Sequence, residues 1–248
     1  MNKFNLLYCH DEGYNLQTFI SINSVLKNSQ SSTYDIHIIH ENPETFRDYY
    51  ERLISSPKIN EIFLYKFNDN DNFFPNISGK HVSAATYYRL FIENYLPKSL
   101  NSLIYLDSDV IAIKNVDEIF EKCEKEILES KFTVSVSIEM VKLNENHDVF
   151  KNLELSGNNY FNAGVMFIDY EKWKNETSVR EFLELIDLYK DKIIFWDQDV
   201  LNKFFDDNFL KLNDNLNFRV YEPVDYNKLD SNAILLHYSG NSKPWTIQ

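Results

Sequence analysis

Two carboxylates directly follow an apolar run in the middle of the chain. The run is Leu103 to Leu106, the carboxylates are Asp107 and Asp109, and a second apolar run follows from Val110 to Ile113. In an extended chain, residues two apart lie on the same side, so both carboxylates point one way and Ser108 the other. A divalent cation such as Mg²⁺ or Mn²⁺ would remove their mutual repulsion and could bridge to phosphate oxygens. The alternative is a solvated turn after an edge strand, where aspartates are also common.

Polar groups also follow a short apolar run near the end of the chain. His237 comes directly after Ile234 to Leu236, Gly240 allows a tight turn, and Lys243 supplies an ammonium group. An imidazole can join carboxylates around Mn²⁺, and a lysine can neutralise a phosphate. The alternative is a terminal turn whose histidine forms hydrogen bonds only within the protein.

Four more charged side chains lie in or beside other predicted elements. Arg89 is in the middle of a helix predicted over 84–95, where it forms either a surface ion pair or part of the site. Glu139 follows the end of a predicted strand. Asp197 and Asp199 open another helix, where negative charge complements the helix dipole even without a functional role.

The composition excludes several classes of protein. The chain has 248 residues and is 44% hydrophobic, which is enough for a full core. A balance of 25 basic against 38 acidic residues argues against a nucleic-acid partner, because phosphates require a basic face. Two cysteines are too few for a disulfide framework, and no apolar run is long enough to span a membrane. We therefore expect a cytoplasmic protein.

The order of the predicted elements is typical of an α/β fold. Strands are predicted over 4–9, 34–40 and 61–67, with helices over 16–26 and 43–54 between them. This alternation indicates a parallel sheet with crossover helices, and such sheets bind ligands beyond the carboxyl ends of their strands. The turn at Asp11 and the pair Asp107 and Asp109 should therefore meet in one site.

A later helix has a clear start signal and an amphipathic pattern. Ser178 and Glu181 form a capping box, and the apolar positions that follow are Phe182, Leu183, Ile186 and Leu188. There is no internal repeat and no linker. We therefore expect one domain over residues 1–248.

Five motifs in a fixed order span nearly the whole chain. They are HVSAATYYRL (His81 to Leu90), LIYLDSDV, YFNAGVMFID, WDQDVLN and HYSGNSKPW. Together they resemble the retaining glycosyltransferases of family 8, which include glycogenin and bacterial lipopolysaccharide or lipo-oligosaccharide galactosyl- and glucosyltransferases. The resemblance implies a single GT-A domain, a Rossmann-like nucleotide-sugar-binding fold with a mostly parallel central sheet flanked by helices. It further implies transfer of galactose or glucose from a UDP-sugar to a saccharide acceptor, with Mn²⁺ or alternatively Mg²⁺.

The matched motifs imply a role for each candidate residue. The metal ligands would be Asp107, Asp109 and His237. The nucleotide and diphosphate would contact Cys9, Asp11, Ser108, Gly240 and Lys243. The donor sugar would be surrounded by Arg89, Glu139, Asn162, Ala163, Asp197 and Gln198, the last two forming the catalytic pair. Glu139 stands where many family members have Asp, and Glu12-Gly13 where close relatives tend to have Asp-Asn.

The sequence allows two routes for retention and two alternative functions. Retention can proceed through a carboxylate nucleophile or by front-face attack, and the amide of Gln198, a poor nucleophile, favours the second route. A self-glucosylating enzyme of the glycogenin kind and a non-catalytic UDP-sugar-binding module are the alternatives. We expect loops 68–80 and 141–159 to contact the acceptor, and membrane association to be at most peripheral, on the inner face.

Overall fold

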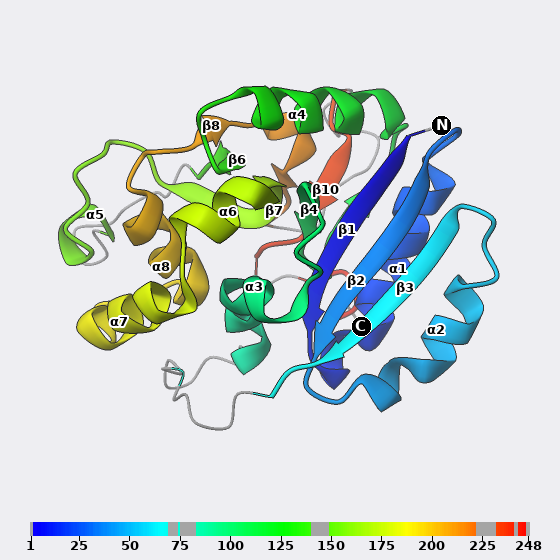
Figure 1. Ribbon diagram of the computed structural model, residues 1–248, viewed down its shortest axis with the longest axis horizontal. Helices are drawn as coiled ribbons and strands as arrows, with labels where there is room; N and C mark the ends of the chain where they lie inside the picture. The colour runs from blue at the N-terminus through cyan, green and yellow to red at the C-terminus, as the bar shows by residue number, and fades with distance from the viewer. Residues whose placement is uncertain are drawn as a thin grey trace.

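The central element of the fold is a seven-stranded sheet (Figure 1). The computed structural model describes residues 2–68, 74, 83–139, 149–221, 232–240 and 243–246. The strand order is β3-β2-β1-β4-β7-β6-β8. The strands are β1 Lys3–His10, β2 Thr33–His40, β3 Ile59–Lys66, β4 Ser102–Leu106, β6 Val134–Ile138, β7 Phe161–Asp169 and β8 Leu210–Lys211.

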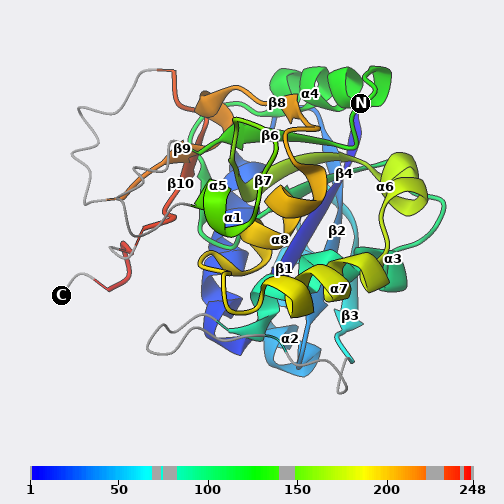
Figure 2. The same cartoon turned by 90° about the vertical axis from the view of Figure 1, so that its left-hand side faces the viewer.

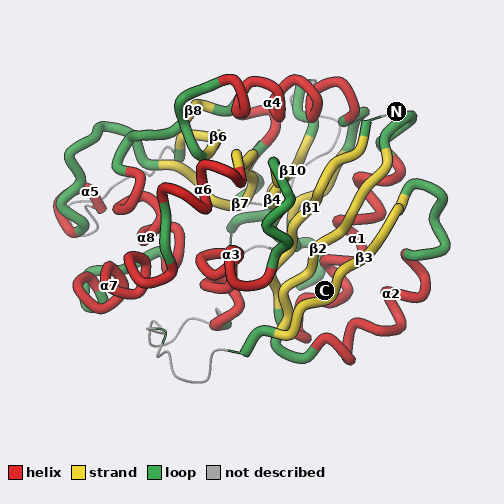
Figure 3. Tube along the Cα trace, viewed as in Figure 1, coloured by secondary structure: helices red, strands yellow, loops and turns green. Residues whose placement is uncertain are grey.

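The sheet is mostly parallel, as predicted. β1 pairs in parallel with both β2 and β4, β2 with β3, and β6 with β8. Figure 3 shows β1, β2 and β3 side by side. β7 is the exception, because it runs antiparallel to its neighbours β4 and β6. The start of β7 therefore lies at the edge where the parallel strands end, which is the edge at which such sheets bind ligands.

Helices cover both faces of this sheet (Figure 1), and the central strands β1, β2, β4, β6 and β7 are buried almost throughout. Phe4, Leu6 and Tyr8 of β1 pack in one core with α1 Asn15–Lys27, α2 Arg47–Leu53 and α4 Asp117–Glu129. Leu7 and Cys9 pack in the other core, with α3 Ile92–Tyr95, α6 Tyr170–Glu176, α7 Val179–Tyr189 and α8 Trp196–Phe205. Burial on both faces explains why these strands are continuous apolar runs.

A second, three-stranded sheet lies beside the first and brings the late strands to it. Its order is β5-β10-β9, formed by Val110–Ala112, Leu235–His237 and Phe218–Arg219. β5 follows β4 after the two aspartates, and β10 pairs antiparallel with it, so that His237 lies opposite Val110. Figure 2 shows β10 beside β9, with which it pairs in parallel.

Two helices predicted as continuous are divided in the structure. Residues 43–54 form a 3₁₀ helix, η2 Pro43–Phe46, followed by α2. Residues 84–95 form another, η3 Ala84–Phe91, followed by α3, and Ser83 accepts a hydrogen bond from Ala85 N as the predicted cap. In a 3₁₀ helix residues three apart are eclipsed, so Thr86 and Arg89 lie on the same side. Both side chains contact Asp197, so the tighter helix places two partners beside one carboxylate of the cavity wall.

Helix α7 begins with the predicted capping box, but one of its predicted apolar positions is wrong. Ser178 Oγ accepts a hydrogen bond from Glu181 N at 3.2 Å and donates one to the Glu181 carboxylate at 2.7 Å. Phe182 and Ile186 are buried, whereas Leu188 is 69% exposed. Tyr189, seven residues after Phe182, is buried instead, because a spacing of seven returns to the same helix face.

A single helical turn, α5 Val149–Asn152, lies between β6 and β7. It falls where the sequence predicts a short helix, over 148–153, within the otherwise irregular stretch 141–159. None of the helices that the structure describes is long and apolar enough to cross a membrane. Most of loop 68–80 and residues 141–148 lie outside the described residues, so their predicted acceptor contacts stay predictions.

Candidate active site

A cavity of about 730 Å³ opens at the carboxyl ends of the parallel strands. Its walls come from the end of β1, from η3, from the turn between β4 and β5, and from the starts of β7 and α8. All the site residues predicted from the sequence line it except Gly240. They are Cys9, Asp11, Arg89, Asp107, Ser108, Asp109, Glu139, Asn162, Ala163, Asp197, Gln198, His237 and Lys243.

Gly240 instead permits a close approach between two backbone segments. A Cβ atom on this glycine would lie 2.9 Å from the Cα of Tyr221 and 3.0 Å from its carbonyl oxygen. Any larger residue would push these segments apart, so its absence of a side chain is explained by packing. Its predicted contact with a diphosphate stays a prediction.

The first strand delivers a thiol and a carboxylate to one end of the cavity. Burial raises the pKa of Cys9, so its side chain is a neutral thiol. Asp11 accepts a hydrogen bond from Gly13 N at 2.9 Å and so caps the short 3₁₀ helix η1, Glu12–Tyr14. Its carboxylate also lines the cavity.

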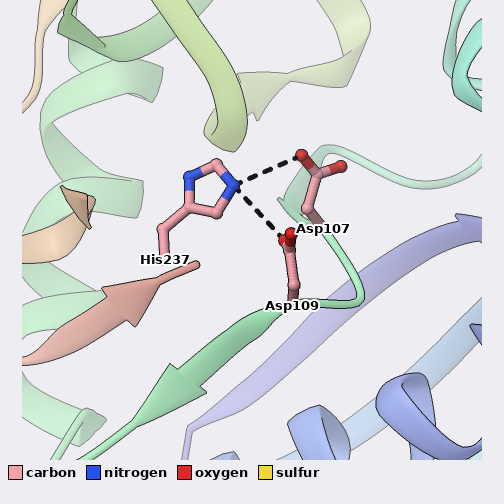
Figure 4. A group of neighbouring side chains, drawn as sticks. All are labelled: Asp107, Asp109 and His237. Atoms are coloured by element: carbon pink, nitrogen blue, oxygen red, sulfur yellow. Dashed lines mark ion pairs between the residues drawn. The ribbon is translucent and has the colours of Figure 1, made fainter. Parts of the chain in front are cut away.

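Asp107, Asp109 and His237 form a cluster on the cavity wall (Figure 4). Nε2 of His237 lies 3.3 Å from Asp109 Oδ1 and 3.7 Å from Asp107 Oδ2. One ligand atom from each residue lies within 4.8 Å of the others. The extended chain expected here is wrong, because β4 ends at Leu106 and a turn closed by a hydrogen bond from Val110 N to Asp107 O carries both aspartates. The hydroxyl of Ser108 lies 2.7 Å from that of Thr18.

Each of the two carboxylates uses one oxygen within the protein and turns the other toward His237. Asp107 Oδ1 accepts hydrogen bonds from Arg89 Nη2 and from the Tyr105 hydroxyl, both at 2.7 Å. Asp109 Oδ2 accepts one from Lys243 Nζ at 2.5 Å. Burial opposes ionisation of Asp109, but His237 and Lys243 lower its pKa to about 2, so it is charged at neutral pH.

This donor set fits a hard divalent cation. Asp109 Oδ1 is buried and accepts no hydrogen bond from the residues that the structure describes. Two carboxylate oxygens and an imidazole nitrogen are ligands that suit Mn²⁺, and carboxylates also suit Mg²⁺. The geometry therefore favours a metal site over the two alternatives. These were a solvated turn for Asp107 and Asp109 and a terminal His237 bonded only within the protein.

Gly164 provides the space in front of this cluster. A Cβ atom there would lie 2.2 Å from Cε1 of His237 and 2.8 Å from Oδ2 of Asp107. Real Cβ atoms do not make contacts this short, so any side chain would displace the imidazole or the carboxylate. The small residues that open this strand in the sequence thus allow the ligand cluster to approach the backbone.

The start of β7 leaves the regular sheet and serves the cavity. Its pairing with β6 passes from Met166 directly to Asn162, so the three residues between them have no partner on β6. Ala163 N donates to Gln198 Oε1 at 3.1 Å, and Ala163 O accepts from Arg89 Nη1 at 2.8 Å. This β-bulge turns backbone groups toward the side chains of the cavity.

Arg89 is a buried site residue and does not form a surface ion pair. It is 5% exposed and lies 2.7 Å from an oxygen of Asp107 and 2.9 Å from one of Asp197. Its guanidinium group also lies over the ring of Tyr105, 4.2 Å from the centroid. Burial raises the pKa of Asp197 to about 6, although Arg89 opposes the shift.

Gln198 is held at both ends of its amide. Its oxygen accepts from Ala163 N, and its nitrogen donates to the Tyr160 hydroxyl at 3.2 Å. Tyr160 in turn donates to Asp199, whose other oxygen accepts from the backbone amides of Ile194 and Phe195. Asp199 therefore stabilises the start of α8, which agrees with the alternative that its charge serves the helix end and not the site. Asp197 instead pairs with Arg89.

Four polar residues of the site were not identified from the sequence. Tyr105 and Thr86 contact the carboxylates, Tyr160 orients Gln198, and Asn217 contacts His237. Tyr105 had a signal, since it lies two residues before Asp107 in an extended run and therefore on the same side. Asn217 had none, because it lies in a polar stretch, 213–217, that is typical of a turn.

Known proteins resemble this chain over most of its length. General stress protein A of Bacillus subtilis is 24% identical over 185 residues, which cover 68% of this chain and 62% of that protein. Lipopolysaccharide 1,2-glucosyltransferase of Escherichia coli is 25% identical over 254 residues, which cover 98% of this chain and 73% of that protein. The chain thus spans about two thirds of the length of these curated relatives.

A solved structure shares the fold. The crystal structure of the galactosyltransferase LgtC, in complex with donor and acceptor sugar analogues, superimposes with a TM-score of 0.78. The sequences are 21% identical, and the match covers 98% of this chain and 89% of that one. This likeness identifies the α/β architecture as the GT-A fold.

The family follows from the sequence as a whole. The profile of Glycosyl transferase family 8 matches residues 5–247. This range includes every described strand of both sheets, except for the first two residues of β1. The match includes all the predicted residues of the cavity wall. The chain therefore belongs to glycosyl transferase family 8.

Proposed function

We propose that the protein is a retaining hexosyltransferase that moves galactose or glucose from a UDP-sugar to a saccharide acceptor, with Mn²⁺ or alternatively Mg²⁺ as its metal. Residues 1–248 would form a single catalytic domain. The proposal is supported by membership of the family and by relatives named as a glucosyltransferase and a galactosyltransferase.

One observation carries the proposal: three ligands for a hard cation face the same cavity that Arg89 and Lys243 supply with positive charge. In a protein of net charge −13, this local arrangement is what a diphosphate requires. Asp107, Asp109 and His237 would hold the metal. When bound, the ion supplies Lewis-acid stabilisation of the negative charge that develops on the leaving diphosphate.

The remaining cavity residues would bind the donor. Cys9 and Asp11 would contact uridine, and Ser108, Gly240 and Lys243 the diphosphate. Lys243 Nζ donates to the backbone carbonyl of Tyr238 as well as to Asp109, which holds the ammonium group at the cavity wall. From there it would neutralise charge on the leaving group.

The contacts of Asp197 and Gln198 favour front-face attack over a covalent intermediate. One oxygen of Asp197 accepts from the Thr86 hydroxyl and the other is paired with Arg89. The Gln198 amide is a poor nucleophile and is held by Ala163 and Tyr160. Both residues would therefore orient the donor sugar, together with Glu139 and Asn162. A glycosyl adduct on Asp197 or Gln198, detected by intact mass, would contradict this route.

The test is UDP release from a panel of UDP-sugars, with Mn²⁺ and with a chelator. We expect slow release that prefers UDP-galactose or UDP-glucose, requires metal, and disappears in Asp109→Asn. Asp187→Asn is a matched control, because this aspartate pairs with Lys190 on the surface and its side chain is 81% exposed. It should release UDP at the native rate.

Other outcomes of this experiment distinguish the alternatives. A gain of hexose mass on the protein itself would indicate self-glycosylation. Metal-dependent UDP binding without release, even with a panel of saccharide acceptors, would indicate a binding module. Release that is unaffected by the chelator or by Asp109→Asn would contradict the proposed metal site.

A further inference from the structure

Four side chains form a continuous row of hydrogen bonds that ends at His237. Asn162 Nδ2 donates to Glu139 at 2.7 Å, and Asn217 Nδ2 donates to Asn162 Oδ1 at 2.9 Å. Asn217 Oδ1 is then 2.8 Å from Nδ1 of His237. Asn217 is 0% exposed, and Asn162 and His237 are also buried, so water does not compete for these bonds.

The chemistry of the row fixes its direction. A carboxylate only accepts hydrogen bonds, so the Asn162 amide must turn its nitrogen toward Glu139 and its oxygen toward Asn217. The backbone N–H of Gly164, which donates to the same Asn162 oxygen at 3.0 Å, requires the same orientation. Asn217 must then donate to Asn162 and present its own oxygen to His237.

The consequence for His237 is a defined tautomer. Because Nδ1 faces an amide oxygen, it must donate a proton to that oxygen, so in any neutral form of the ring the lone pair is on Nε2. Nε2 is the atom that faces Asp107 and Asp109. A lone pair beside two carboxylate oxygens is the arrangement that a cation needs, and hydrogen bonds to the second ring nitrogen orient histidine ligands in this way.

We propose that Asn217 is a positioning residue that fixes the tautomer and ring orientation of His237, and through them the affinity of the cluster for a divalent cation. The inference about affinity rests on the proposed metal site. Asn217 lies directly before β9, and the pairing of Phe218 with Leu236 and of Arg219 with His237 keeps it beside the imidazole. Two strands of the small sheet thus carry the ligand and its support.

The tautomer is tested in metal-free protein by ¹⁵N NMR of the histidine ring nitrogens, assigned with His237→Gln and recorded at a pH high enough for the ring to be neutral. We expect the unprotonated signal on Nε2 in the native protein and a mixture of the two tautomers in Asn217→Leu. Asn217→Asp loses the donor to Asn162 but keeps an acceptor beside Nδ1, so it should keep the native tautomer. An unchanged tautomer in Asn217→Leu would overturn the proposal.

The affinity is tested with Mn²⁺ alone as the probe, by titration calorimetry and by the EPR signal of free Mn²⁺. Loss of a hydrogen-bond partner of a metal-bound histidine typically weakens metal binding about 10- to 100-fold, which we expect for Asn217→Leu, while Asn217→Asp retains binding. Asn15→Leu is the matched control, because Asn15 is a buried asparagine that bonds His40 at 3.0 Å. It should leave Mn²⁺ affinity unchanged.

The outcomes separate the two proposals. Equal Mn²⁺ affinity in native protein and folded Asn217→Leu would overturn the role of Asn217. The same loss in Asn15→Leu would also overturn it, because the effect would then reflect destabilisation alone. Absence of Mn²⁺ binding in the native protein would contradict the proposed metal site, whereas the NMR result would still decide the tautomer.

Discussion

Arg89 balances the charges of two aspartates that approach the cavity from different elements. Asp107 follows β4 and Asp197 belongs to α8, and each has an oxygen within 3 Å of the guanidinium group. All three side chains are largely shielded from water, with Arg89 and Asp197 almost completely buried. Removing one partner from such a group leaves the others without compensation, which costs far more than breaking a surface ion pair.

We predict that Arg89→Met lowers the free energy of unfolding by about 3–5 kcal/mol, the usual loss when a buried ion pair is broken. Urea unfolding at pH 7.5 measures it. Arg180→Met is the control, because Arg180 pairs with Glu184 while 87% exposed. Its free energy of unfolding should be close to that of the native protein, because exposed ion pairs contribute little to stability. Equal losses in the two variants would show that Arg89 is not energetically distinct.

The meeting of Asp107 and Asp109 at one site was predictable, but the physical reason differs from the predicted one. The prediction assumed an extended chain, whereas a turn closed by a hydrogen bond from Val110 N to Asp107 O directs both carboxylates toward His237. Asn217 could not be predicted in this way, because its role depends on which strand pairs with β10. That pairing joins residues about twenty positions apart across a stretch without periodicity, so only the folded chain reveals it.

Strand β7 is the element that combines sheet and site. Its antiparallel direction brings Asn162, Ala163 and Gly164 to the edge where the parallel strands end. Asp107 N donates to Gly164 O at 2.8 Å, which holds the turn with the aspartates against this strand. The side chain that is missing at Gly164 is then what leaves room for His237.

We predict that Gly164→Ala abolishes measurable Mn²⁺ binding, because its Cβ would displace His237 or Asp107. Titration calorimetry with Mn²⁺ checks the prediction, and circular dichroism shows whether the variant is folded. Gly13→Ala is the control, since the nearest atom to its Cβ, Asp11 Oδ1, would be 3.2 Å away. Native Mn²⁺ affinity in folded Gly164→Ala would mean that the cluster can move without loss.

The order of elements was more predictable than their exact form. Alternating apolar runs and amphipathic stretches identified β1, α1, β2 and β3 and the crossover connections between them. The direction of β7 was not predictable, because a strand buried on both faces has the same sequence pattern in either direction. The 3₁₀ helix η3 was also missed, since its tighter geometry follows from the contacts of Thr86 and Arg89 with Asp197.

At the scale of the molecule, three buried histidines couple stability to pH. His10, His37 and His40 lie at or near the ends of β1 and β2, and all are almost completely buried. The ring of His10 packs against those of His40 and Phe46. Burial lowers the pKa of His10 to about 3 and that of His37 to about 4, and it also lowers that of His40.

We predict that stability falls as the pH drops below about 6.5, because the unfolded chain then binds protons that the folded chain excludes. The contribution is fully present above pH 6.5 and decreases toward the folded pKa values of about 3 and 4. His10 and His37 should each lower the free energy of unfolding by about 1.4 kcal/mol between pH 7.5 and 5.5, and His40 should act in the same direction.

The measurement is urea unfolding of the native protein and of His10→Phe at both pH values. Phenylalanine keeps an aromatic ring beside Phe46 but binds no proton, so the variant should lose about 1.4 kcal/mol less than the native protein over this interval. Identical pH dependence in the two proteins would show that His10 does not contribute.

The bulge in β7 limits how far this protein can be stabilised by redesign. A redesign that rewards regular pairing would remove the residues without a partner on β6, Ala163 to Val165, or replace them with β-branched residues. A strand changed in this way would no longer offer a carbonyl to Arg89, an amide to Gln198 or space to His237, and it would lose its pairing with Leu106 and Asp107. A search for robust variants should therefore leave these three positions unchanged.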